Sequence, residues 1–201
     1  MPTPWLKKIR DIGKLTVYNA GDEWKVSIDK AITTFNTLGF PVTLAAESNI
    51  EVANIVVKLA KGADKHQFKS RYYSDPTVKT RARFNPAFPH GDTVLLVDPD
   101  RNEVAFAATF LPGKLDGPSD GLKEALVVHE LIHGCGLDGG RGPGKPNDRG
   151  QDHDSVGIMY DLMRETPNGI VEGNVRDNNK SMPPIRVGAK TRNDLVSIWK
   201  K

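Results

Sequence analysis

Two histidines one helical turn apart are the first residues in this sequence that could do chemistry together. His129 and His133 are the first and last residues of the motif HELIH. Positions i and i+4 of a helix project from one face, so the two imidazoles can take two corners of a tetrahedral Zn²⁺ site. Glu130 projects toward a neighbouring face, where its carboxylate can reach a water on the metal without binding the metal. The motif therefore predicts a zinc site in which Glu130 is the general base.

The residues that follow HELIH extend the pattern. The chain continues GCGLDGG and later reads SVGIMY. His129, Glu130 and His133 match HExxH, and Gly136 stands at the glycine of the longer motif HExxHxxGxxH. Met159 stands where a methionine-containing turn follows that motif. The sequence thus resembles the metzincin zinc peptidases, and its upstream segments are similar in order to the matrixin-like branch. This resemblance implies hydrolysis of peptide bonds in a protein or peptide substrate, with Zn²⁺ as cofactor.

The third metal ligand departs from the metzincin pattern. The family has this histidine three residues after the glycine, and here that position is Gly139, which has no side chain. The next histidine, His153, precedes Met159 at close to the family's spacing. The resemblance therefore favours His153 as third ligand, with residues 139–152 as an insertion that loops outward, and Asp138 is the alternative. Three protein ligands leave one coordination position for water.

Other residues near the motif are assigned structural roles. Cys135 is the only cysteine, so it forms no internal disulfide, and an isolated cysteine of this kind behaves as a small buried hydrophobe. In the family the methionine corresponding to Met159 forms a hydrophobic floor beneath the metal. Tyr160 is interpreted as a packed aromatic residue without a role in the reaction.

The segments around HELIH predict an α+β fold in a single domain, residues 1–201. Residues 61–92 are predicted to form a long excursion with little regular structure, and residues 136–190 are loop-like. The fold implied by the resemblance is zincin-like, a mixed twisted sheet with an N-terminal helix, the HExxH helix and a C-terminal helix. The predicted strands are 14–20, 41–47, 54–60, 93–98 and 104–110, and the predicted helices run from Asp22 to Gly39, from Ser119 or Asp120 through HELIH, and over 191–200.

Composition and charge limit the partners that the chain is expected to have. A formal charge of +3 gives too weak a field to indicate nucleic acid or an anionic membrane. The stretch 66–84 mixes basic and aromatic residues, and a solvated loop or a partner-docking surface is favoured there over a grip on single-stranded nucleic acid. Neither a signal peptide nor a transmembrane segment is evident. The expected location is therefore the cytoplasm or an assembled particle.

A second function competes with the peptidase. The chain could be an assembly component, such as a virion protein, that keeps a zincin fold with or without activity. A purely structural zinc site is normally closed by four ligands and has no use for a general base. Glu130 therefore favours the enzyme.

Overall fold

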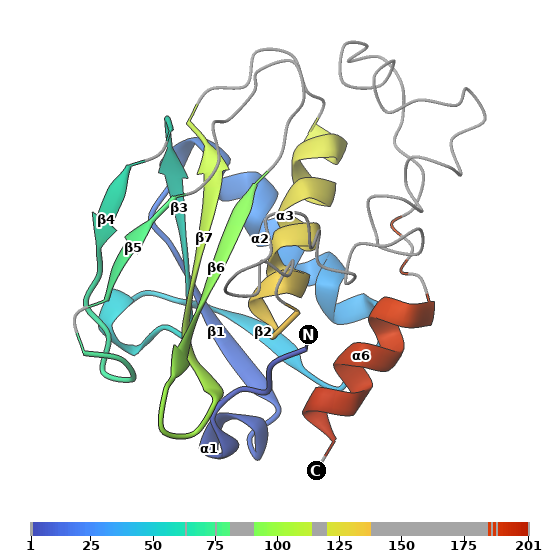
Figure 1. Ribbon diagram of the computed structural model, residues 1–201. Coiled ribbons are helices and arrows are strands. Elements are labelled where there is room, and N and C mark those ends of the chain that lie inside the picture. The colour runs from blue at the N-terminus through green and yellow to red at the C-terminus, as the bar shows by residue number, and fades with distance from the viewer. Residues whose placement is uncertain are drawn as a thin grey trace, which may run out of the picture.

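The computed structural model is built around a five-stranded sheet, with helices packed on one face and a two-stranded sheet on the other (Figure 1). The described residues are 2–62, 64–74, 76–80, 91–113, 120–137, 185, 187 and 189–200. The helices are α1 (Lys7–Arg10), α2 (Lys25–Thr37), α3 (Asp120–Gly134) and α6 (Ala189–Trp199), with 3-10 turns η1 (Asp22–Trp24) and η2 (Ile50–Val52). The strands are β1 (Lys14–Asn19), β2 (Thr43–Glu47), β3 (Ile55–Ala60), β4 (Lys65–Gln67), β5 (Thr77–Lys79), β6 (Asp92–Asp98) and β7 (Glu103–Pro112).

The order of strands in the main sheet is β2-β1-β3-β7-β6. Strands β1 and β2, β1 and β3, and β3 and β7 pair in parallel, whereas β6 and β7 form an antiparallel hairpin. Parallel neighbours need a crossover, and α2 supplies it between β1 and β2. Strand β6 lies at the edge of the sheet. The sheet is therefore mixed and mostly parallel, with helices packed against it.

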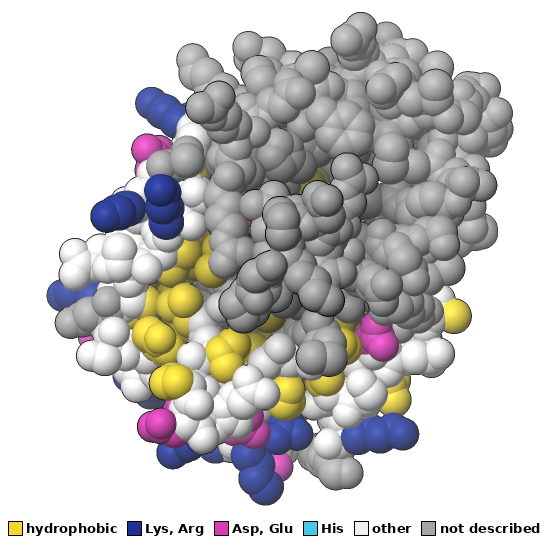
Figure 2. All heavy atoms as spheres, viewed as in Figure 1, with side chains coloured by type: hydrophobic (Ala, Val, Ile, Leu, Met, Phe, Trp, Pro, Cys, Tyr) yellow, Lys and Arg dark blue, Asp and Glu magenta, His cyan; other side chains and the backbone are white. Residues whose placement is uncertain are grey.

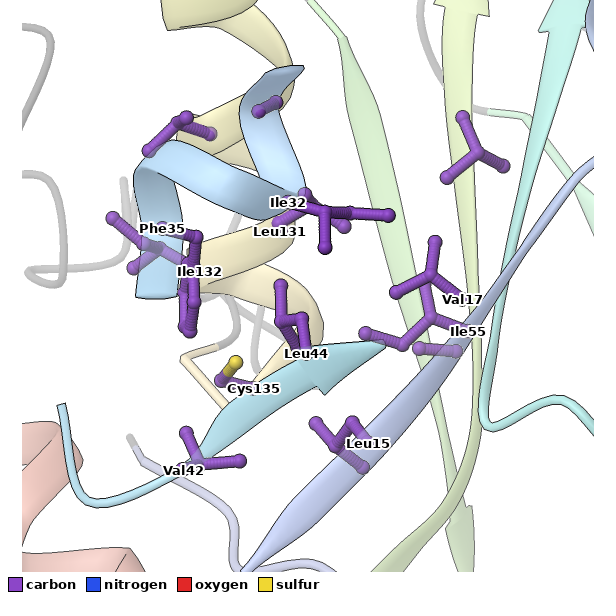
Figure 3. Close-up of a cluster of buried hydrophobic side chains, with 14 of the residues drawn as sticks. Leu15, Val17, Ile32, Phe35, Val42, Leu44, Ile55, Leu131, Ile132 and Cys135 are labelled. Carbon is purple, nitrogen blue, oxygen red and sulfur yellow. The ribbon is translucent and has the colours of Figure 1, made fainter. Parts of the chain in front are cut away.

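The main hydrophobic core lies between the sheet and helices α2 and α3 (Figure 3). Side chains alternate along each strand, so Ile55 and Val57 face this core while Val56 faces the opposite side. On α2, Ile32 and Phe35 lie one turn apart and both are buried against the core. Burial of each such side chain contributes about 1.5–3 kcal/mol. The core therefore fixes α3 against both α2 and the sheet.

The opposite face of the sheet is covered by the hairpin β4–β5, whose two strands of three residues lie within the excursion predicted over 61–92. Phe68 and Val78 come from this excursion and are almost fully buried. The Phe68 ring lies 5.5 Å from the ring of Phe106 and 6.1 Å from that of Phe110, measured between centroids. Strands of three residues are too short to show alternation in the sequence, and their stability comes from this non-local burial.

One histidine of the hairpin packs among these aromatic residues. The His66 ring lies 4.7 Å from the Phe110 ring, and its Nε2 atom is buried without a hydrogen-bond partner among the described residues. Burial lowers the pKa of His66, and the positive charge of Lys58 lowers it further, while Asp64 opposes them. The neutral imidazole is therefore the form that the fold favours.

Helix α6 closes the core at the ends of α2 and α3. It corresponds to the C-terminal helix predicted over 191–200. Its residues Leu195, Ile198 and Trp199 are buried, which confirms the predicted inward face. The Arg192 guanidinium donates a hydrogen bond of 2.8 Å to the Leu38 carbonyl at the end of α2. The C-terminal helix is thus tied to the end of α2.

Charged side chains lie around the edge of the described surface in Figure 2, and hydrophobic side chains lie between them. On the face shown in Figure 2, lysine and arginine side chains lie at several separate places, with acidic side chains between them. None of the described helices combines the length and apolar character that crossing a bilayer requires.

Candidate metal centre

Helix α3 carries the HELIH motif through the interior of the molecule. It begins at Asp120, one of the two predicted start residues, and it contacts α2 as well as β6 and β7. A helix packed on several sides must be apolar around most of its circumference. The buried apolar residues of α3 are Ala125, Leu126, Val127, Val128, Leu131 and Ile132. The motif therefore sits on a rigid element.

The structure brings His129 and His133 together as the spacing predicts. Their ring centroids lie 4.9 Å apart and the rings are nearly perpendicular, at 86°. The Nδ1 atom of His133 is hydrogen-bonded to the Leu137 carbonyl. A carbonyl oxygen only accepts, so Nδ1 carries the hydrogen and the Nε2 lone pair remains for a metal. Histidines that bind metals typically donate their other ring N–H in this way, so His133 fits a zinc ligand.

The remaining predicted members of the site lie outside the described residues. These are His153, the alternative ligand Asp138, the empty ligand position Gly139, Met159 and Tyr160. Within the described ranges, no group of three His, Cys, Asp or Glu side chains is arranged to hold a metal. The assignment of the third ligand therefore stays a prediction.

Glu130 is buried, with 4% of its surface exposed, and one residue of the edge strand β6 contacts its carboxylate. The Thr93 hydroxyl of β6 lies 2.6 Å from Glu130 Oε2. The Thr109 hydroxyl of β7 lies 3.0 Å from that of Thr93. A Cβ atom added to Gly91 would lie 2.5–2.7 Å from the last atoms of the Glu130 side chain. The carboxylate is thus enclosed by a hydroxyl on one side and a bare backbone on another.

The sequence did not predict these surroundings of Glu130, which consist of Thr93 and Gly91 beside the carboxylate and Thr109 behind Thr93. Alternation along the predicted strand 93–98 places Thr93 on the same face as Leu95 and Val97, which pack toward the main core. This alternation predicts that Thr93 points toward the main core. It does not predict which side chain of the core Thr93 contacts. The contact itself depends on how β6 lies against α3.

The C-terminal end of α3 is held by both ends of the described chain. The indole N–H of Trp5 donates to the Gly134 carbonyl at 2.9 Å, and that of Trp199 donates to the Cys135 carbonyl at 2.9 Å. The Thr3 amide donates to the Gly136 carbonyl at 2.8 Å. Gly136 has φ +112°, a conformation that L side chains rarely adopt. These bonds occupy carbonyls that a helix end otherwise leaves unsatisfied, and they fix where the chain leaves α3.

Cys135 is fully buried in the main core, in agreement with its interpretation as a small hydrophobe. Burial raises the pKa of its thiol far above the ordinary value. The thiolate is the form that binds metals and reacts. Cys135 therefore contributes packing to the end of α3.

Comparison with known proteins gives structural similarity alone. No protein-family model and no curated protein matches this sequence. A crystal structure of myroilysin aligns with a TM-score of 0.36 and 17% identity, over 67% of this chain and 46% of that chain. A second structure of myroilysin aligns with a TM-score of 0.44 and 14% identity, over 99% of this chain and 96% of that one. The chain thus spans less than half the length of the first of these structures. At these values the chain is similar to myroilysin without being placed in a family.

Proposed function

We propose that residues 1–201 form one zinc-dependent metallopeptidase domain of the metzincin type, which hydrolyses peptide bonds in proteins or peptides. The observation that carries the proposal is the geometry at HELIH. His129 and His133 present neighbouring rings on one helix, and the hydrogen bond to the Leu137 carbonyl directs His133 Nε2 away from the backbone. Glu130, the residue that follows His129 on the helix, is buried. One rigid helix thus supplies two of the three protein ligands and the base that metal-assisted hydrolysis uses.

The proposed ligands are His129, His133 and His153. The first two bind through one helix face, and His153 follows from the resemblance to the metzincin motif. Helix α3 stops at Gly134, and the bonds from Trp5 and Trp199 hold the two carbonyls that follow its last histidine. The first two ligands are therefore held in place by packing before a metal binds, which lowers the entropic cost of binding it.

The proposed reaction uses Glu130 to move one proton. Bound zinc supplies Lewis-acid chemistry that polarises the scissile carbonyl and makes water nucleophilic near neutral pH. Glu130 accepts a proton from this water while the water oxygen bonds to the carbonyl carbon. The same proton then passes from Glu130 to the amide nitrogen as the C–N bond breaks. The products are a carboxylic acid and an amine, and Glu130 returns to its carboxylate form.

The experiment that tests the proposal compares the wild type with Glu130→Gln, which keeps the size of the side chain and removes the base. We expect about one zinc per chain in both proteins by metal analysis, lost to a strong chelator. Turnover of a peptide library should fall by at least ~10² in the variant. Equal turnover in the two proteins contradicts the proposal. Zinc binding by a wild type that cleaves no peptide favours the assembly component instead.

A further inference from the structure

The contacts of Glu130 with the edge of the sheet point to a role for two threonines that the HELIH motif does not include. Thr93 is on β6 and Thr109 is directly opposite it on β7, in the antiparallel register of the hairpin. Directly opposed residues project from the same face of a sheet, and here that face carries α3. We propose that Thr93, oriented by Thr109, is a positioning residue for the Glu130 carboxylate. The inference rests on the proposed peptidase function.

The direction of the hydrogen bonds follows from the groups involved. A glutamate that acts as a base is ionised and only accepts, so the single hydroxyl hydrogen of Thr93 is donated to the nearer acceptor, Glu130 Oε2 at 2.6 Å, and not to the Glu130 carbonyl oxygen at 3.2 Å. Thr93 Oγ1 then acts as the acceptor for the Thr109 hydroxyl at 3.0 Å. Thr109 is completely buried, so a hydroxyl there needs a partner inside the protein. Its bond to Thr93 favours the rotamer in which the Thr93 hydroxyl faces Glu130.

The space around the carboxylate is limited on a second side. The Cβ atom that any other residue would carry at Gly91 would lie 2.7 Å from Glu130 Oε1 and 2.6 Å from Cδ. The backbone of residue 91 thus closes the space beside Oε1 while Thr93 holds Oε2. A glutamate side chain has three rotatable bonds, and a general base must be held within about 0.5 Å of its productive position. Packing and the Thr93 hydrogen bond together restrict these rotations.

The test uses substitutions that remove one hydroxyl at a time. Thr93→Val keeps the shape of the side chain and removes the donor, and Thr93→Ser restores the donor on a smaller side chain. Thr109→Val leaves the Thr93 donor in place and removes its orienting partner. Thr77→Val is the matched control, because it makes the same change at an exposed position of β5.

We expect kcat of Thr93→Val to fall by at least ~10-fold, with KM and zinc content within about twofold of the wild type. Thr93→Ser should recover most of the wild-type kcat. The loss of kcat in Thr109→Val should be smaller than in Thr93→Val, and Thr77→Val should have the kcat of the wild type. In crystal structures of the zinc-loaded proteins, Glu130 should accept from Thr93 in the wild type and turn away in Thr93→Val.

Two results overturn the inference. The first is wild-type kcat in Thr93→Val when the wild type is active and Glu130→Gln is not. The second is a zinc-loaded Thr93→Val structure in which the Glu130 carboxylate has not moved. If neither the wild type nor any variant cleaves peptides, the proposed function fails, and the two crystal structures alone decide whether Thr93 positions Glu130.

Discussion

The substitution Gly91→Ala should displace the proposed base while leaving the fold intact. The added Cβ would lie 2.5 Å from Glu130 Cγ, 2.6 Å from Cδ and 2.7 Å from Oε1. Carbon atoms in favourable contact lie about 3.5–4.0 Å apart, so the end of the Glu130 side chain must move by roughly 1 Å or more. A displacement of this size near reacting atoms costs about 10²-fold in rate. We therefore expect kcat to fall by about two orders of magnitude.

The stability of Gly91→Ala should change little. The group that must yield is the end of a side chain with three rotatable bonds, and the φ of Gly91 lies outside the left-handed region. Alanine in place of glycine at a compatible position stabilises by about 0.4–1 kcal/mol through the unfolded chain, which offsets part of the cost of moving Glu130. Thermal melts should therefore place the variant within a few degrees of the wild type, an estimate based on about 2–4 °C per kcal/mol.

The assay measures kcat, zinc content and melting temperature in the same preparations. Gly62→Ala is the matched control, because nothing lies within 4 Å of the Cβ it would add. The reasoning is refuted if Gly91→Ala retains the wild-type kcat. It is also refuted if activity is lost together with zinc, since the displacement should affect the base and spare the two histidines.

Three further predictions concern the helix end, the hairpin and the third ligand. Trp199→Phe removes the indole donor to a buried carbonyl after α3, so the free energy of unfolding in denaturant should fall by about 1–3 kcal/mol, and an unchanged value contradicts that role. Burial and the charge of Lys58 hold the pKa of His66 below its ordinary value of 6.5 in the folded protein. As pH falls, the His66 imidazole is therefore protonated in the unfolded chain before it is protonated in the folded one. Stability should therefore decrease below about pH 6.5, more steeply in the wild type than in His66→Gln, and equal slopes exclude the effect. His153→Ala should abolish zinc binding in metal analysis while Asp138→Ala retains it, and the reverse outcome assigns the ligand to the aspartate.

Local patterns in the sequence were sufficient to predict the helix of the site and much of the frame around it. The spacing of His129 and His133 is a property of any α-helix, so their shared face required no knowledge of the fold. Apolar periodicity also predicted α2 and α6, and apolar β-branched runs predicted β3 and β6, because each of these signals acts within one element.

The surroundings of Glu130 were decided by contacts between residues distant in the chain. Thr93 lies 37 positions before Glu130, and Trp5 lies 129 positions before the carbonyl that it holds. The hairpin β4–β5 likewise depends on burial of Phe68 against β7. A local pattern specifies which face of an element is buried, but not which element will cover that face. The packing of α3 against β6 and β7 determines this, because it decides which hydroxyl group contacts the buried Glu130 carboxylate.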